Sequence, residues 1–231
     1  MLNEQKLEDV DHEKLGTTNV ARLHIYLNAT SRGIWAADCQ RSGQPGNQFR
    51  DRPRRKRIDA PDTDPPRFPL QNVPIVRRRL AALFSERAEA LVCSAACGAD
   101  LVALEEAERF GLRRRIVLPF PPTRFRETSV TDRPGDWGPV FDRLVAAAEA
   151  AGDLVILQST GDDNDAAYAA AVQAIIREAE ALARPTSEAT SLRLIGVIVW
   201  EGSAREGIDA SGGLQKLATQ AGFEERSLLT R

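Results

Sequence analysis

The sequence predicts an α/β protein, a Rossmann-like three-layer sandwich whose mostly parallel sheet is covered by helices on both faces. Short apolar runs alternate with segments of helical periodicity from residue 74 to residue 200. Each helical segment is long enough to carry the chain from one parallel strand to the next, which requires a crossover connection. Layers of this kind bury the sheet on both sides and leave only the helices facing water.

The elements follow one another regularly. Val76, Leu80 and Leu83 recur on one face and predict a helix over residues 74–88. The polar segment 124–130 has no such pattern, and we expect it to be a loop. The other expected elements are a strand at 90–93, a helix at 98–110, a strand at 114–118, a helix at 136–150, a strand at 154–157, a helix at 166–183, a strand at 192–200 and a last short helix at 213–221.

The first part of the chain differs from the rest. Residues 1–57 are expected to be a divergent, flexible extension, and residues 58–231 the folded domain. Within the extension, residues 20–27 alternate well enough for a strand, whereas 50–57 are rich in arginine and have no periodicity. The four consecutive cations at 54–57 cannot end a strand buried on both faces. Either residues 20–27 supply the first strand through a long connection, or the sheet lacks that strand.

Composition sets limits on the function. A chain of 231 residues with 42% hydrophobic content can bury a sizeable core. Lys and Arg total 31 against 33 Asp and Glu, so binding to nucleic acid or membrane driven by the net charge of the protein is not expected. The chain has no apolar run near the roughly 20 residues that a membrane helix needs and no signal-peptide pattern at its start. We expect a cytoplasmic protein.

The turn at residues 94–98 has the composition of a phosphate-binding loop. Ser-Ala-Ala-Cys-Gly separates a short apolar run from an amphipathic helix, and small side chains there let an anion approach the backbone. The free N–H groups and the dipole of the helix would attract that anion. A tight turn between a strand and a helix also favours small residues for packing alone, and both interpretations stay open.

Other polar groups follow the ends of neighbouring strands, which converge in a parallel sheet. Arg126 could pair with a phosphate while Thr128 or Ser129 donates a hydrogen bond, or Arg126 could pair with Glu127 or Asp132 in a surface loop. The aspartates at 162, 163 and 165 fit a helix N-cap better than a magnesium site. Tyr168 fits either a stacked base or the core.

Cysteine and histidine usage indicates no metal site. The three cysteines are too few and too unevenly spaced for a disulfide framework or a zinc site, and both histidines lie far upstream. Cys93 is expected to be a small buried residue. Cys97 could be reactive if the helix dipole lowered its pKa, but a role as a small loop residue is favoured. We expect no metal and no cofactor.

Several segments together resemble the SLOG superfamily, which includes DprA and the LOG phosphoribohydrolases. They are the run from Ser94 to Leu101, Val117 to Phe120, Phe125 to Val130, and Asp136-Trp137 with Phe141. The resemblance covers roughly residues 58–213 and lies closest to bacterial members of unassigned or sensory role. It implies a Rossmann-like fold, nucleotide binding and a role in signalling.

The resemblance does not extend to catalysis. LOG proteins hydrolyse an N-glycosidic bond with an Arg and a Glu in a glycine-rich motif, and the comparable stretch at 211–216 lacks that Glu. Gly212 and Gly213 could still hold a phosphate through backbone N–H groups. The residues expected to bind a ligand are Ser94, Ala95, Ala96, Cys97, Gly98, Ala99, Asp100, Arg126, Thr128, Ser129, Gly212 and Gly213.

The sequence therefore predicts a sensor module that binds a nucleotide or nucleotide derivative and signals to a protein effector, without catalysis of its own. An oligomer is compatible with that role, and neither nucleic acid nor a membrane is an expected partner. Two alternatives remain. A phosphoribohydrolase-like enzyme would need Glu105, Glu106 or Glu201 in the cleft, and a DprA-like binder of single-stranded DNA would need the basic arm at 50–57.

Overall fold

A six-stranded parallel sheet forms the centre of the molecule. The computed structural model describes residues 22–26, 57–157, 164–184, 193–202 and 219–231. The strands lie in the order β4-β3-β2-β1-β5-β6, and every neighbouring pair is parallel. The strands are β1 (Arg22–Tyr26), β2 (Ala88–Cys93), β3 (Arg113–Leu118), β4 (Leu154–Ile156), β5 (Arg193–Trp200) and β6 (Glu224–Leu229). The predicted fold class is confirmed.

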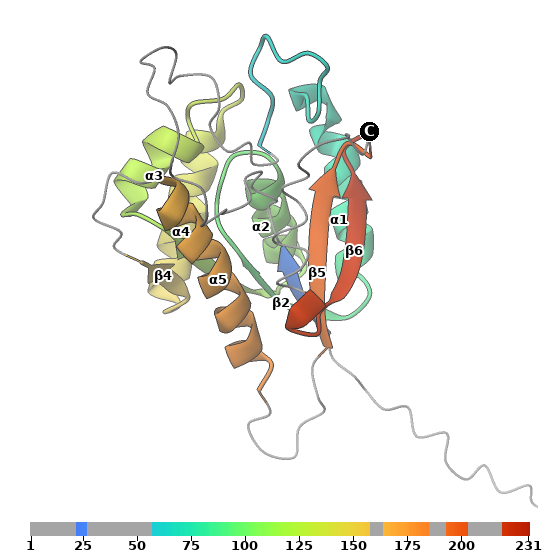
Figure 1. Ribbon diagram of the computed structural model, residues 1–231, viewed down its shortest axis with the longest axis vertical. Coiled ribbons are helices and arrows are strands. Elements are labelled where there is room, and N and C mark those ends of the chain that lie inside the picture. Colours follow the sequence, from blue (N-terminus) through green and yellow to red (C-terminus); the bar gives the residue numbers. More distant parts are fainter. Residues whose placement is uncertain (1–21, 27–56, 158–163, 185–192, 203–218) are drawn as a thin grey trace, which may run out of the picture.

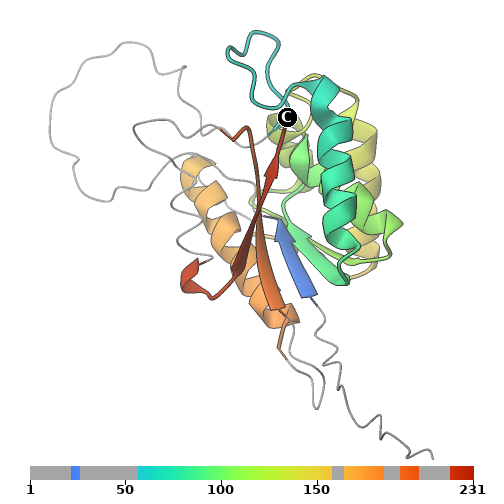
Figure 2. The same ribbon diagram turned by 90° about the vertical axis from the view of Figure 1, so that its right-hand side faces the viewer.

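Helices cover both faces of the sheet (Figures 1 and 2). On one face the side chains of Leu91 and Leu118 join a core cluster with α1, α2 and α4, while on the other face Val92 and Val117 pack against α5. Alternate residues of one strand thus enter opposite cores, because successive side chains of a strand point to opposite faces. The helices are α1 (Val73–Phe84), preceded by a 3-10 turn at Leu70–Asn72, α2 (Ala99–Arg109), α3 (Pro122–Ser129), α4 (Trp137–Ala150) and α5 (Asn164–Leu182).

The first strand comes from within the expected extension. Residues 22–26 form β1, which pairs with β2 on one side and with β5 on the other, so that Leu23 lies beside Ala90 and Leu194. Of the two sequence-based alternatives, residues 20–27 do supply the strand. The domain boundary expected at residue 57 would separate β1 from its neighbours β2 and β5, so β1 is part of the folded domain.

Two other expectations need correction. The segment expected as a loop at 124–130 is mostly helix α3, which begins behind Pro121 and buries Phe125 completely. Proline suits the start of a helix, and one buried aromatic ring fixes this otherwise polar helix on the core. Strand β6 near the C-terminus was not predicted, because this edge strand is charged and largely exposed. Of the helix expected at 213–221, residues 213–218 lie outside the described part.

Candidate functional site

The turn between β2 and α2 is buried rather than open. Ala95, Ala96 and Cys97 have no exposed surface, and within residues 94–98 only Ser94 is partly exposed. Gly98 has φ +95°, and a Cβ there would lie 2.9 Å from the backbone N of Ile58. Glycine is required at this position both for its positive φ and for this close approach. The small residues therefore make room for another part of the same chain.

The polar groups of this turn have partners within the protein. Asp100, in the first turn of α2, accepts hydrogen bonds through Oδ2 from the Ser94 hydroxyl and, at 3.1 Å, from the Ala96 N–H. The Cys97 N–H donates to the Ser129 carbonyl at 3.0 Å. A phosphate approaching these N–H groups would meet the buried carboxylate of Asp100. The turn thus has the shape of an anion-binding loop, with a carboxylate of the protein in contact with it.

Residues 57–59, here called the strap, lie across the turn. The Arg57 side chain is 12% exposed, and its Nη1 lies 2.6 Å from Asp132 Oδ1 and 3.2 Å from the Thr128 carbonyl. Ile58 is buried in the main core. Asp59 Oδ2 accepts hydrogen bonds from the N–H groups of Arg67 and Phe68, both at 2.7 Å. The strap is therefore held by the burial of Ile58, by the hydrogen bonds to Asp59, and by the ion pair and the hydrogen bond that Arg57 makes with Asp132 and Thr128.

The predicted ligand-binding residues of α3 point in different directions. Arg126 Nε lies 2.8 and 3.1 Å from the two carboxylate oxygens of Asp142 on α4, and this hydrogen bond raises the pKa of the guanidinium. The Thr128 hydroxyl donates to the Arg124 carbonyl at 2.9 Å. Ser129 is buried beside the turn. Arg126 thus pairs with a carboxylate, as one interpretation expected, but the partner is Asp142 and not Glu127 or Asp132.

Tyr168 connects α5 to this region. Its hydroxyl lies 2.8 Å from the Ser129 hydroxyl, and its ring makes an edge contact with Phe120 at 5.4 Å between centroids. The ring packs against the main core. Trp137 and Phe141 are buried in the same core.

Both described cysteines are buried free thiols. Cys93 and Cys97 have no exposed surface. Burial raises the pKa of the Cys97 thiol to about 12, although the charge of Arg57 and a hydrogen bond from the Ile58 backbone act in the opposite direction. Burial and the charge of Asp100 likewise raise the pKa of Cys93. The expectation that Cys93 is a small buried residue is confirmed, and Cys97, expected as a small loop residue, is buried as well.

The carboxylates required by the enzyme alternative are held in ion pairs. Arg77 on α1 lies 2.6 Å from Glu105 and 2.7 Å from Glu106, so both carboxylates face the contact between α1 and α2. Glu201, at the end of β5, is buried and lies 4.0 Å from Arg67 Nε. Within the described residues, no group of three or more His, Cys, Asp or Glu side chains could hold a metal ion.

Part of the predicted site lies outside the described residues. Gly212 and Gly213 fall there, as do Asp162, Asp163 and the basic residues 50–56. The backbone of Asp165 belongs to the first turn of α5.

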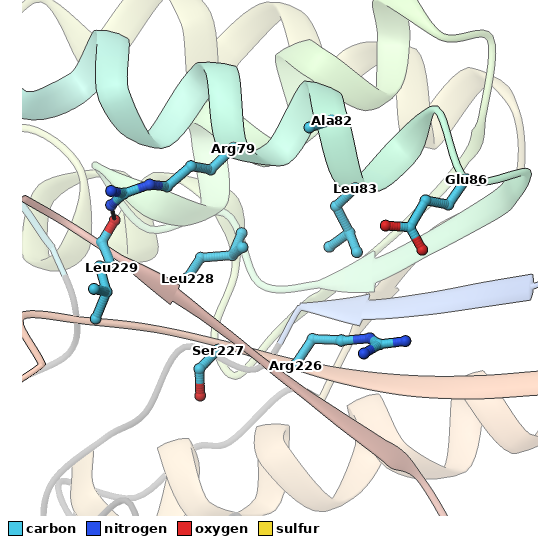
Figure 3. Close-up of a pocket in the computed structure, with 8 residues that line it drawn as sticks. All are labelled: Arg79, Ala82, Leu83, Glu86, Arg226, Ser227, Leu228 and Leu229. Carbon is cyan, nitrogen blue, oxygen red and sulfur yellow. Dashed lines mark hydrogen bonds between the residues drawn. The ribbon is translucent and has the colours of Figure 1, made fainter.

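A groove of about 500 Å³ lies elsewhere, between α1 and the edge strand β6 (Figure 3). Leu83 points from α1 toward β6, and Arg79 donates to the Leu229 carbonyl at one end. Sequence reasoning missed this groove because it missed β6. The lining residues are Arg79, Ala82, Leu83, Glu86, Arg226, Ser227, Leu228 and Leu229.

Comparisons with models of protein families, with curated proteins and with solved structures gave no match. The resemblance to the SLOG superfamily therefore stays a prediction. Among the described helices, none combines the length and the apolar character that crossing a bilayer requires.

Proposed function

We propose that this domain binds a nucleotide or nucleotide derivative at the carboxyl edge of its sheet and passes the binding event to a protein partner. The observation that supports the proposal most strongly is the strand order. From β1 the sheet grows through β2, β3 and β4 in one direction and through β5 and β6 in the other. Open parallel sheets bind ligands in the crevice outside the strand ends where the order reverses, here between β1 and β5.

The neighbouring turn supports the same location. Residues 94–98 follow β2, the strand next to β1, and lead into the N-terminus of α2. Ser94 is the partly exposed residue of this turn and forms its rim toward solvent. The positive end of the α2 dipole adds a favourable field for a phosphate near that rim. Binding there would change the contacts of the segments around the turn, and a protein partner would detect that change.

Binding is favoured over hydrolysis. Glu105 and Glu106 are neutralised by Arg77 at a contact between helices, away from the strand ends. A glycosidase needs a carboxylate in the cleft to stabilise a cationic transition state or to activate water. Glu201 stands at the end of β5, but it lies near Arg67 and is buried.

A thermal-shift screen against AMP, NAD, ADP-ribose and cyclic dinucleotides tests the proposal. A ligand at about 100 times its dissociation constant stabilises the folded state by about 2.7 kcal/mol, which gives a measurable shift. The variant Ser94→Tyr should lose the shift because the ring fills the rim of the turn. Ser85→Tyr, on the exposed C-cap of α1, is the matched control and should keep it. Cooperative melting with no shift from any nucleotide would overturn the proposal.

A further inference from the structure

The hydrogen bonds of the turn raise the question of which groups would hold the phosphate. The Ala96 N–H donates to Asp100, and the Cys97 N–H donates to Ser129. Both donors are therefore satisfied before any ligand arrives. A phosphate that used them would displace a buried carboxylate or a backbone contact, which costs more than replacing a partner at the surface.

Two guanidinium groups lie above the turn with one carboxylate between them. Asp132 Oδ1 is 2.6 Å from Arg57 Nη1, and Asp132 Oδ2 is 3.7 Å from Arg133 Nε. The Arg133 Nε atom is buried and has no hydrogen-bond partner within the described part of the chain. Two cations thus share a single anion, and one of the cations is incompletely satisfied. The charges of all three groups act on the Cys97 thiol, so the cluster lies close to the turn.

We propose that Arg57 and Arg133 form the anion-binding pair of the site, and that the phosphate of the ligand exchanges with the Asp132 carboxylate. This inference rests on the proposed function. Guanidinium groups bind phosphate through parallel hydrogen bonds, and a phosphate offers more acceptor oxygens than a carboxylate. The Asp132 side chain is 29% exposed, so a ligand can reach this carboxylate from solvent.

The exchange couples binding to the strap. Ile58 and Asp59 anchor the strap, whereas Arg57 is held over the turn through its side chain. When a phosphate replaces Asp132, Arg57 keeps an anionic partner but Asp132 loses its contact with the strap. The segment that follows α3 is then released from the strap, and this release is the conformational signal that a partner can detect.

The experiment measures binding of inorganic pyrophosphate and of AMP to the full chain by calorimetry. Asp132→Asn removes the competing charge but keeps an oxygen for Arg57, and it should tighten pyrophosphate binding at least tenfold. Arg133→Gln should weaken binding at least tenfold. The matched control is Glu224→Gln. The Glu224 side chain is also 29% exposed and also lies between two arginines, Arg193 and Arg226, but it stands at the start of β6 and not at the carboxyl ends of the strands. This variant should leave the affinity unchanged.

The outcomes separate this inference from the proposed function. If the wild-type chain binds AMP and neither Asp132→Asn nor Arg133→Gln changes the affinity, the anion pair is wrong while the nucleotide site stands. If Asp132→Asn and Glu224→Gln tighten binding equally, the effect is one of net charge, and the exchange is wrong. Absence of AMP binding to the wild type and to Asp132→Asn would reject both proposals. Circular dichroism and cooperative melting verify that each variant is folded.

Discussion

A carboxylate lies between two arginines at the amino ends of the strands, here the amino edge of the sheet, and another at their carboxyl ends, the carboxyl edge. The two clusters differ in the number of hydrogen bonds and in the exposure of the carboxylate. At the amino edge, Asp153 lies between Arg113 and Arg115 and is 7% exposed, with hydrogen bonds of 2.7 to 3.1 Å from both guanidinium groups. At the carboxyl edge, Asp132 accepts one hydrogen bond from Arg57 and is 29% exposed.

The difference indicates different roles. Asp153 links the start of β3 to the start of β4, and Arg115 continues the network to Glu178 on α5. The hydrogen bonds from Arg113 and from Arg115 to Asp153 would be lost together if the Asp153 carboxylate were removed. Asp132 is more exposed than Asp153 and accepts a single hydrogen bond from Arg57, so fewer contacts depend on its carboxylate. The dense cluster is suited to holding the fold, and the sparse cluster is suited to exchanging its anion.

The largest expected effect is on stability at the amino edge. Asp153→Ala should lower the free energy of unfolding by about 3 kcal/mol, because it leaves Arg115 without its central buried partner. Asp132→Asn should lower it by less, about 1 kcal/mol, because the amide oxygen still accepts the hydrogen bond from Arg57. Urea denaturation of both variants measures this contrast. Equal losses would remove the distinction between a structural and an exchangeable cluster.

A second effect on stability is expected at Gly98, the glycine of the turn that contacts the strap. Gly98→Ala should cost about 2–3 kcal/mol, because the position has φ +95° and the new methyl group meets the Ile58 backbone at 2.9 Å. Gly111→Ala is the control, with φ +68° and nothing within 4 Å, and should cost about 1 kcal/mol. The same denaturation experiment applies. If both variants lost the same free energy of unfolding, the strap would move to accommodate the methyl group, and its contact with Gly98 would not be a tight one.

The pH dependence of stability sharpens the comparison further. Hydrogen bonds from Arg113, opposed in part by burial, lower the pKa of Asp153 below its usual value. A depressed carboxyl pKa contributes stability above the unfolded value, about 3.9 for Asp, and that contribution is lost as the pH falls through the folded value. The wild type should therefore lose stability below about pH 4 more steeply than Asp153→Asn. Parallel curves from pH 5 to pH 2 would contradict this assignment.

The smallest expected effect is a change in thiol labelling. With its pKa raised to about 12 and no exposed surface, Cys97 should react with iodoacetamide at pH 8 only after the strap opens. Asp132→Asn should increase labelling of Cys97 relative to Cys93, as measured by peptide mass spectrometry. Glu224→Gln should leave the ratio unchanged. A rise at both cysteines would indicate general loosening of the fold and not opening of the strap.

The sequence predicted the fold well where side-chain pattern and backbone geometry agree. The strand before Ser94 and the helix after Gly98 follow directly from apolar spacing and a glycine turn, and both are confirmed. The β6 strand was missed because its side chains are mostly polar and its place depends on pairing with β5. The sequence pattern located the candidate turn. It could not show that Asp100 accepts the hydrogen bonds of the turn or that the strap covers it, because those contacts depend on the folded backbone and, for the strap, join distant segments.

The position of β1 has a consequence for how the molecule is made. Among the described strands β1 is synthesised before the others, yet it lies between β2 and β5, and β5 is synthesised only after β2, β3 and β4. Until then one side of β1 lacks its neighbour, and contacts between such distant segments form slowly. A shortened chain that started at residue 58 would leave β2 and β5 as two bare edges facing each other. Such edges promote aggregation, so the early residues protect the finished sheet as well as completing it.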